Sequence, residues 1–477
     1  MTIQYDNLNN QITAVGSATD IPIVLQPKGT GALQAQVADS TATGGNARGA
    51  NAVDWQTSRS AASQVASGSY ATISGGIQNT SNGFNATIAG GASNTSSGNY
   101  SFVGAGGGNS ASQSHSSVVG GYTNTVAGFL NFIGGGYTNS GTSGSAVTTQ
   151  SGTMNGTTAV TLSGSNANIK VGQLITGTSI NTFPHTYVAA ISGTSLTLSQ
   201  VASGSSTSTL SFFTPHGVVV GGGNNQATGS YSFIGGGGDA GTAANRNVAS
   251  GDWSFVGGGF KNVASGKQSF IGNGDNGIAS GTFSSVLNGS ISNQASATYA
   301  NILNGTYNIA SGVYSTVING SGGSTRGLSN YTVFAGIFGS AIGDTQAGLM
   351  VLKANTSDAT ATALTVNNAA AGTTNQVILP NNSAYYFRGE VISGVTGGGN
   401  TKGWFIEGVI KRGANAASTA LVGTPTVTSN YADAGASTWT IAVTADTTNG
   451  GLAVTFTGQA STTIRTVAQI RTTEMTY

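Results

Sequence analysis

Hydrophobic residues along most of this chain recur in one short frame, in which an aliphatic residue precedes a glycine-rich corner. The stretch ASGDWSFVGGGFKNVASGKQSFIG, residues 249–272, shows the frame twice. The aliphatic position recurs every 15 residues at Ile73, Ile88, Val103, Val118 and Ile133. It resumes at Ile234, Val256, Ile271, Val286, Ile302 and Val317, in steps of 22, 15, 15, 16 and 15 residues, and the longest step contains the loop GGDAGTAANRN. The chain therefore carries the same unit eleven times.

Each unit predicts two short strands joined by two tight corners. A unit of this length is too short for a propeller blade or a helical repeat, and its glycines and β-branched residues disfavour helix. Glycine at a corner permits a positive φ without a Cβ clash, and asparagine is the next best residue there. Stacked units would form parallel strands about 4.8 Å apart with aliphatic ladders inside. We therefore predict an all-β fold with a parallel β-roll of 15-residue coils, over residues 65–139 and 217–322.

Other patterns flank and interrupt the roll. Residues 140–216 contain alternating stretches such as TYVAAISG and TSLTLSQVASG, which predict an inserted β domain. Residues 323–384 predict a β transition region. Residues 385–477 contain five strand-like runs, and Asn449-Gly450 between two of them is a strong hairpin signal. We expect a C-terminal antiparallel β-sandwich there. Residues 1–64 include Ile21, Ile23 and Leu25 in strand-like alternation, and would attach the fibre or cap the first coil.

Composition and charge narrow the function classes. Only 6% of the residues are charged and the net charge is +1, so no field would gather nucleic acid or anionic lipid. No apolar run approaches the roughly 18 residues of a membrane span. With no cysteine, disulfides and thiolate sites are excluded. One coil buries only one or two apolar residues, so we expect the roll to need partner copies, as a homotrimer.

The repeat units resemble a known class. GSYSFIGGG, ASGDWSFVGGG and ASGKQSFIGNG resemble the left-handed β-roll repeats in the heads of trimeric autotransporter adhesins and in many bacteriophage fibre proteins, although they are richer in Gly-Gly. The stretch DIPIVLQPKGTGALQAQ is similar to an N-terminal motif of phage tail and fibre proteins, and residues 385–477 resemble their C-terminal domains. We find no signal peptide, coiled-coil stalk or membrane anchor in the sequence, which favours the phage class over a cellular adhesin.

Candidate chemistry in the repeats is sparse. The carboxylates there are Asp239, Asp252 and Asp275, which a depolymerase would need within about 5 to 9.5 Å of each other. Asp252 and Asp275 are 23 residues apart, which places them on different faces of the roll. His115, His185 and His216 lack the spacing of metal ligands, and we expect no metal or cofactor. We expect no catalytic residue.

Aromatic residues are the remaining candidates for binding. Tyr70, Tyr100, Tyr231 and Trp253 recur beside a corner, where they would either stack on sugars or stabilise the coils as a ladder. Outside the roll, we single out Tyr385, Trp404, Trp439 and Tyr187 as candidate receptor contacts, with core packing as the alternative for the tryptophans.

The resemblance implies a non-enzymatic, homotrimeric virion fibre. Residues 1–64 would attach to tail or capsid proteins, and the distal β domains would bind a host surface receptor, either a glycan or a protein. We expect it on the virion and, after release, outside the cell. A capsid-decorating head fibre and a depolymerase tailspike are the alternatives.

Overall fold

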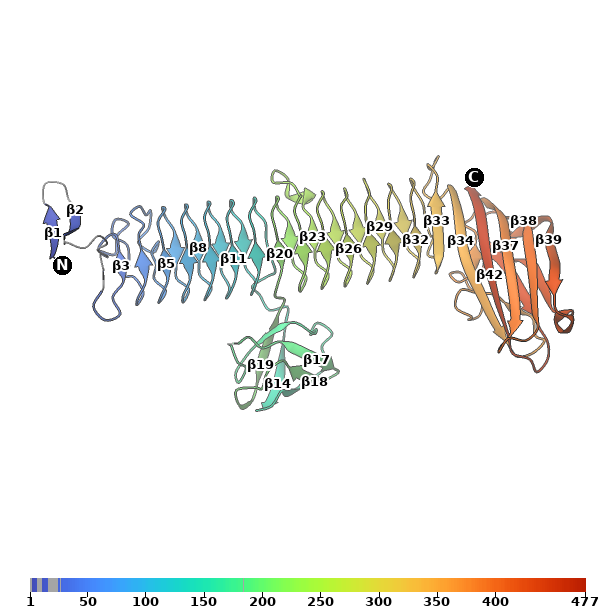
Figure 1. Ribbon diagram of the computed structural model, residues 1–477, viewed down its shortest axis with the longest axis horizontal. Helices are drawn as coiled ribbons and strands as arrows, with labels where there is room; N and C mark the ends of the chain where they lie inside the picture. The colour runs from blue at the N-terminus through green and yellow to red at the C-terminus, as the bar shows by residue number, and fades with distance from the viewer. Residues whose placement is uncertain (1, 7–10, 16–24, 26, 183) are drawn as a thin grey trace. The chain divides into compact units, whose positions relative to one another are not determined.

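The computed structural model describes residues 2–6, 11–15, 25, 27–182 and 184–477, and the described chain is all-β with three short 3-10 turns (Figure 1). It divides into two compact units, Met1–Thr125 and Val126–Tyr477. In the described ranges, no helix has the length and apolar character needed to cross a membrane. Ile21 and Ile23 of the predicted N-terminal strand lie outside the described residues.

Unit 1 consists of a hairpin and a ladder of parallel two-residue strands. The hairpin is β1 (Thr2–Asp6) and β2 (Gln11–Val15). The first ladder contains β3 (Leu33–Gln34), β4 (Val53–Asp54), β5 (Thr72–Ile73), β7 (Thr87–Ile88), β9 (Phe102–Val103) and β11 (Ser117–Val118). The second contains β6 (Thr80–Ser81), β8 (Thr95–Ser96) and β10 (Ser110–Ala111), while β12 (Thr125–Val126) spans the unit boundary. Ile73 pairs with Ile88, and Ile88 with Val103, so the predicted aliphatic ladder is confirmed.

The parallel ladder begins earlier than the predicted boundary at residue 65. Strand β3 pairs with β4, and β4 with β5, through coils of 20 and 19 residues that do not fit the 15-residue frame. Asp54 occupies the aliphatic position and is fully buried. Its Oδ2 lies 2.8 Å from Nε of Arg48 and 3.2 Å from Nη2 of Arg59. An ionic cluster therefore terminates the apolar ladder, and residues 48–59 act as a cap.

A buried asparagine ladder binds successive coils together. The Nδ2 of Asn94 donates to the carbonyl of Gly90 at 3.1 Å and to that of Gly106, one coil on, at 3.0 Å. Its Oδ1 accepts from the backbone N–H of Asn109 at 3.0 Å. The same pattern recurs at Asn79, Asn109, Asn225, Asn247 and Asn262. The asparagine that ends each sequence repeat is thus an interior residue that replaces absent side-chain volume with hydrogen bonds.

The two corners use glycine for different reasons. At the Gly-Gly corner, the second glycine has a positive φ, as at Gly76 (+85°) and Gly91 (+87°), as predicted. At the Ala-Ser-Gly corner, the glycine itself has no positive φ, but a Cβ on Gly251 would overlap the carbonyl oxygen of Gly266 in the next coil. The left-handed residue there lies two positions later and is often aromatic, as at Tyr70 (+59°) and Trp253 (+55°).

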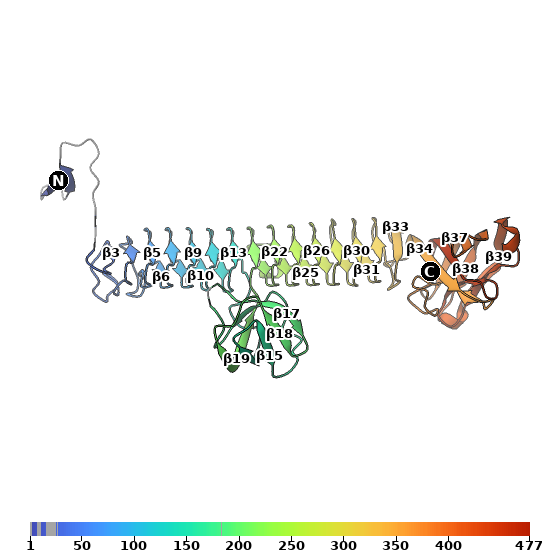
Figure 2. The same ribbon diagram turned by 60° about the horizontal axis from the view of Figure 1, so that its bottom comes forward.

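Unit 2 begins with its own part of the roll (Figure 2). One ladder contains β13 (Phe132–Ile133), β20 (Val218–Val219), β22 (Phe233–Ile234), β24 (Phe255–Val256), β26 (Phe270–Ile271), β28 (Ser285–Val286), β30 (Asn301–Ile302) and β32 (Thr316–Val317). The other contains β21 (Gln226–Ala227), β23 (Val248–Ala249), β25 (Val263–Ala264), β27 (Ile278–Ala279), β29 (Gln294–Ala295) and β31 (Ile309–Ala310), and η1 (Ala243–Asn245) lies in the predicted loop. Ile133 pairs with Val219, so the frame continues across the insertion.

The inserted segment forms a lateral domain of six antiparallel strands. They are β14 (Thr148–Asn155), β15 (Ala159–Leu162), β16 (Leu174–Thr176), β17 (Val188–Ser192), β18 (Ser195–Leu198) and β19 (Ser205–Phe213), in the order β16-β19-β14-β15-β18-β17. A bridge between Leu174 and Tyr187 joins the two edges, so the sheet curls around a core that includes Leu210 and Phe212.

The C-terminal part contains two antiparallel sheets. The larger follows the order β33 (Tyr331–Ala335), β34 (Thr345–Thr356), β42 (Ile464–Thr476), β37 (Ser383–Val395), β38 (Thr401–Arg412) and β39 (Ala420–Ala432). The smaller contains β35 (Thr362–Ala363), β36 (Val377–Ile378), β40 (Thr440–Asp446) and β41 (Gly451–Thr457), and the turns η2 (Ala416–Ser418) and η3 (Ala434–Ala436) complete the region. Rings from both sheets meet at Phe456.

Two sequence predictions are tested directly here. The predicted hairpin is present as β40 and β41, but its loop has four residues, 447–450, and Asp446 accepts hydrogen bonds from Thr448 and Asn449 within it. Strand β34 pairs along its whole length with β42. The C-terminal sheet therefore includes residues 345–356, which the predicted boundary at residue 385 leaves in the transition region.

Candidate binding groove on the C-terminal sheet

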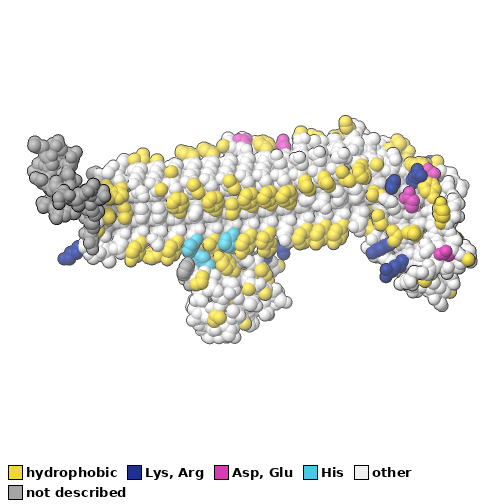
Figure 3. Space-filling model, in the orientation of Figure 1, with side chains coloured by type: hydrophobic (Ala, Val, Ile, Leu, Met, Phe, Trp, Pro, Cys, Tyr) yellow, Lys and Arg dark blue, Asp and Glu magenta, His cyan; other side chains and the backbone are white. Residues whose placement is uncertain are grey.

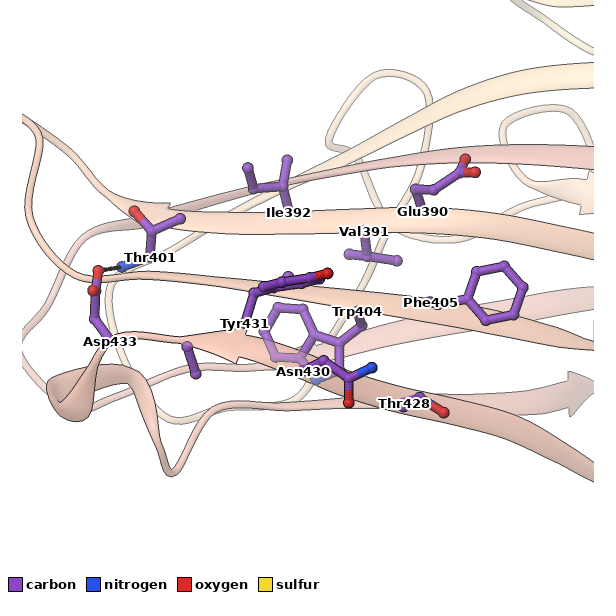
Figure 4. A pocket seen from close by; sticks show the side chains of 12 residues that line it. Glu390, Val391, Ile392, Thr401, Trp404, Phe405, Thr428, Asn430, Tyr431 and Asp433 are labelled. Carbon is purple, nitrogen blue, oxygen red and sulfur yellow. Dashed lines mark hydrogen bonds between the residues drawn. The ribbon is translucent and has the colours of Figure 1, made fainter.

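The outer face of the large sheet carries a groove at β37, β38 and β39. Its volume is about 650 Å³, and Figure 4 shows the side chains around it. Alternation along the strands places Glu390, Ile392 and Phe405 on this face, opposite the core residues Val391 and Trp404. The lining is completed by Thr401, Gly403, Thr428, Asn430, Tyr431, Ala432 and Asp433.

A bulge in β39 shapes the groove. Gly403 pairs with Tyr431 and Phe405 with Thr428, so two residues of β39 face the single residue Trp404. β39 is an edge strand, and bulges are common at edges and beside functional sites. The Tyr431 side chain is 79% exposed, which leaves its ring available to a ligand.

Polar groups and a cation line or border the same face. The Oδ2 of Asp433 accepts a hydrogen bond of 2.8 Å from the backbone N–H of Thr401, which ties β39 to β38 at the end of the groove. The Arg388 guanidinium lies 4.9 Å from the centroid of the Phe405 ring. Exposed aromatic rings beside carboxylate and amide groups can stack on the apolar face of a sugar ring and hydrogen-bond its hydroxyls.

Three of the four predicted receptor contacts are interior residues, so the prediction is wrong for them. Tyr385 and Trp439 are each 1% exposed, and Trp404 is 7% exposed. The Phe456 ring lies 6.2 Å from the ring of Trp404 and 6.1 Å from that of Trp439, edge to face. Trp404 reaches the groove only as part of its floor. Hydrophobic burial against the second sheet is what places these rings inside.

Tyr385 belongs to a buried polar cluster at the junction of the roll and the sheet. Its hydroxyl contacts Arg326, whose Nη1 also lies 2.5 Å from Oε2 of Glu474. Glu474 in turn accepts from the hydroxyl of Tyr331 and, at 2.8 Å, from Gln346. Burial, followed by the nearby carboxylate, raises the pKa of Tyr331 and of Tyr385 well above the ordinary value, so both phenols stay protonated.

The fourth candidate, Tyr187, is half-buried where the lateral domain meets the roll. Its ring stacks on His216 at 5.8 Å, and His216 stacks on Tyr231 at 4.6 Å. His185 lies near Phe129, with ring centroids 6.3 Å apart. His115 in unit 1 stacks on Tyr100 at 4.9 Å. The three histidines are thus ring-stacking residues, and among the described residues no group of three His, Asp or Glu side chains could hold a metal ion.

The recurring aromatics of the roll form ladders, the alternative left open by the sequence. In unit 2, Tyr231 stacks on Trp253, and Phe283 on Tyr299 and Tyr314 in turn. A second row runs through Phe233, Phe255 and Phe270, and Figure 3 shows such hydrophobic rows along the surface. In unit 1, Tyr70 and Tyr100 both pack against Phe84. Stacked rings cover one another's faces, so most present only edges to a ligand.

The three aspartates of the roll are not arranged as a catalytic pair. Asp252 lies at the Ala-Ser-Gly corner, whereas Asp275 lies at the other corner, where it bridges Phe260. Asp239 accepts hydrogen bonds from Asn245 at 2.9 Å and from the backbone of Gly241, and these lower the pKa of its carboxyl. A carboxyl stabilised as the anion is a poor general acid.

Groove residues such as Glu390, Phe405, Asn430 and Tyr431 were missed by the sequence reasoning. Strand alternation carried part of the signal, because Trp404 shares its parity with Ile406 and Ile410, which leaves Phe405 on the outer face. The bulge that exposes Tyr431 has no comparable mark in the sequence.

Comparison with known proteins gives little further guidance. No known protein family matches the chain, and no curated protein is similar to it in sequence. Among solved structures, the chain is similar to a tailspike protein, gp49, of the Acinetobacter baumannii bacteriophage Fri1, described as a capsular polysaccharide depolymerase. The identity is 8%, the TM-score is 0.19, and the alignment covers 92% of this chain and 70% of the tailspike chain.

Proposed function

We propose that this protein is a non-enzymatic structural fibre of a bacteriophage virion, a homotrimer that binds a host surface receptor through its C-terminal domain. The observation that supports it most is found within unit 2. A repetitive coil ladder leads through β32 and β33 into an antiparallel sheet with an open aromatic groove. The ladder would act as a shaft and the sheet, with the smaller sheet packed on it as a sandwich, as the binding head.

The groove fits a glycan receptor better than a flat protein surface. Its exposed ring, carboxylates and amide match the stacking and hydroxyl contacts that saccharides need. Weak individual contacts are sufficient, because three chains per fibre and several fibres per particle bind together. Residues 1–64 would attach the fibre to tail proteins, or to the capsid if it is a head fibre.

The test is to incubate purified protein with a panel of bacterial isolates and to measure surface binding, inhibition of phage adsorption and release of reducing sugar together. We expect binding that blocks adsorption without sugar release. The Tyr431→Ala variant should lose most of this binding, whereas Tyr386→Ala, a tyrosine on the same face but outside the groove, should keep it. Sedimentation should give three times 47.0 kDa, about 141 kDa.

Other outcomes would replace the proposal. Release of reducing sugar would make the protein a depolymerase. Absence of binding to every isolate, with a trimer of normal stability, would favour a capsid-decorating fibre without receptor function.

A further inference from the structure

A second cleft lies in unit 2 where the lateral domain meets the roll. Its volume is about 420 Å³. The lateral domain contributes Ile169, Lys170 and Val171, and two successive coils contribute Asp252, Trp253 and Lys267. The cleft therefore exists only because the inserted domain lies against this part of the roll.

The cleft coincides with a break in the aromatic row. One face of the Trp253 ring is covered by Tyr231, with centroids 5.8 Å apart and planes 7° from parallel. In the next coil, Gln268 occupies the corresponding left-handed position, with φ of 54° against 55° at Trp253. No ring therefore continues the stack, and the Nζ of Lys267 lies 5.3 Å from the Trp253 centroid instead. An ammonium on an exposed stem is displaced more easily than a stacked ring.

The charges of the cleft are unusual for this chain. Lys170 is the single charged residue between Arg59 and Asp239 in the sequence, and its Nζ lies 3.4 Å from Oδ2 of Asp252. Together with Lys267, the lining contains two ammonium groups and one carboxylate, which leaves one positive charge in excess. The apolar side chains of Ile169 and Val171 complete the wall.

We propose that this cleft binds an acidic saccharide, a sugar ring that carries a carboxylate. The apolar face of the ring would lie on Trp253 in place of the Lys267 stem, and its carboxylate would pair with the Lys267 and Lys170 ammonium groups. Asp252 would accept a hydrogen bond from a hydroxyl while it orients Lys170. This extends the proposed receptor function to a second site, one that does not share a residue with the C-terminal groove.

The test uses the full-length protein and three defined probes, followed by calorimetry. Trigalacturonate and 3′-sialyllactose supply the carboxylate in two different sugars, and lactose is the neutral control. We expect at least one acidic probe to bind about tenfold more tightly than lactose, as charge-assisted contacts predict. Trp253→Leu and Lys267→Gln should each weaken that binding by about tenfold.

Two matched controls separate this site from others. Lys261→Gln removes an exposed lysine of the roll that does not line the cleft, and Tyr431→Ala alters the C-terminal groove; neither should change binding of the acidic probe. Because Lys267 is exposed, its replacement should leave the thermal unfolding curve unchanged, even if Trp253→Leu destabilises the roll.

Three results would overturn the proposal. These are equal affinity for lactose and both acidic probes, loss of binding in Tyr431→Ala alone, and no binding of any probe to the folded protein. The last result would leave the Lys170–Asp252 pair as a tether of the lateral domain.

Discussion

At the scale of single residues, the coil is governed by close backbone approach more than by side-chain volume. The aliphatic positions are fully buried, yet each coil contributes only a few of them, and asparagine hydrogen bonds occupy much of the remaining interior. Glycine is required where successive corners touch, but its neighbours at the Gly-Gly corner include positions with open space. Two glycines in one coil can therefore differ greatly in their tolerance of a methyl group.

Gly251 and Gly258 provide a matched test of that difference. A Cβ on Gly251 would overlap the carbonyl of Gly266, whereas one on Gly258 would have no atom within 4 Å and no left-handed φ to oppose it. We expect Gly251→Ala to lower the free energy of unfolding by about 2 kcal/mol or more, as overpacking does. Gly258→Ala should be neutral or raise it by about 0.4 to 1 kcal/mol. Equal urea-unfolding midpoints for the two variants would contradict this account.

At the scale of elements, the joints of unit 2 are polar while the ladders are apolar. The junction between the roll and the large sheet is held by Arg326, Glu474, Tyr331 and Tyr385. The lateral domain meets the roll through stacked aromatic and imidazole rings and through the Lys170–Asp252 pair. Polar joints fix one geometry but are more sensitive to the loss of a partner than an apolar contact is.

Removal of the Glu474 charge should destabilise the distal joint. The Glu474 side chain is fully buried and the Arg326 side chain nearly so, so Glu474→Gln would leave a guanidinium with a weakened partner. We expect a loss of about 3 to 5 kcal/mol in the free energy of unfolding of the C-terminal domain. Glu390→Gln, on the exposed face of β37, should change it by less than about 0.5 kcal/mol. Chemical denaturation followed by tryptophan fluorescence would compare the two.

The lateral joint should weaken in mild acid. Burial, with a smaller effect of His185, lowers the pKa of His216 below its ordinary value of 6.5, and the groups facing it are His185, Tyr187 and Tyr231. The open joint then binds more protons than the closed one, so its stability is fully present above about pH 6.5 and falls as the pH drops from there through the lowered pKa.

Hydrogen exchange around residues 185–187 and 213–216, compared at each pH with a His216→Gln variant, would measure this effect. Protection should fall with acid in the wild type and stay flat in that variant. His115→Gln, in unit 1, should behave like the wild type, and a flat wild-type profile would remove His216 from any role in the joint.

The elements differ in how far their sequence predicts them. The coil repeat is legible because each copy has the same pattern, and that alone predicts the ladders and the strands of the lateral domain. The first coils are not legible, since their 20- and 19-residue lengths and the buried Asp54 leave no repeated mark. The binding groove depends on a bulge in β39 and on which face of β38 meets a second sheet, and both are set by tertiary packing.

At the scale of the whole molecule, the separation of charge is the dominant feature. Eleven of the 29 charged residues lie in 385–477, whereas Lys170 is alone among residues 60–238. The roll therefore depends on backbone hydrogen bonds, asparagines and stacked rings, none of which is screened by salt. The ionic clusters at Asp54 and Glu474 are buried, where screening is also weak.

We accordingly expect thermal stability to be nearly independent of ionic strength. The melting temperature should change by less than about 3 °C between roughly 0.05 M and 1 M NaCl, as measured by calorimetry. The acidic-probe affinity of the lateral cleft should fall over the same range, which supplies an internal positive control for screening. A large rise or fall in melting temperature would show that surface charge contributes more than the structure indicates.

The insertion point of the lateral domain has a consequence for how such a chain can change over evolutionary time. Ser140 and Gln226 form adjacent rungs, and Asn225 takes the hydrogen bond of Asn139 as if the 86 intervening residues were absent. A recombination event at this corner could exchange one side domain for another, or delete it, without shifting the register of any later coil. Diversification of what the molecule recognises is thereby uncoupled from the integrity of its scaffold.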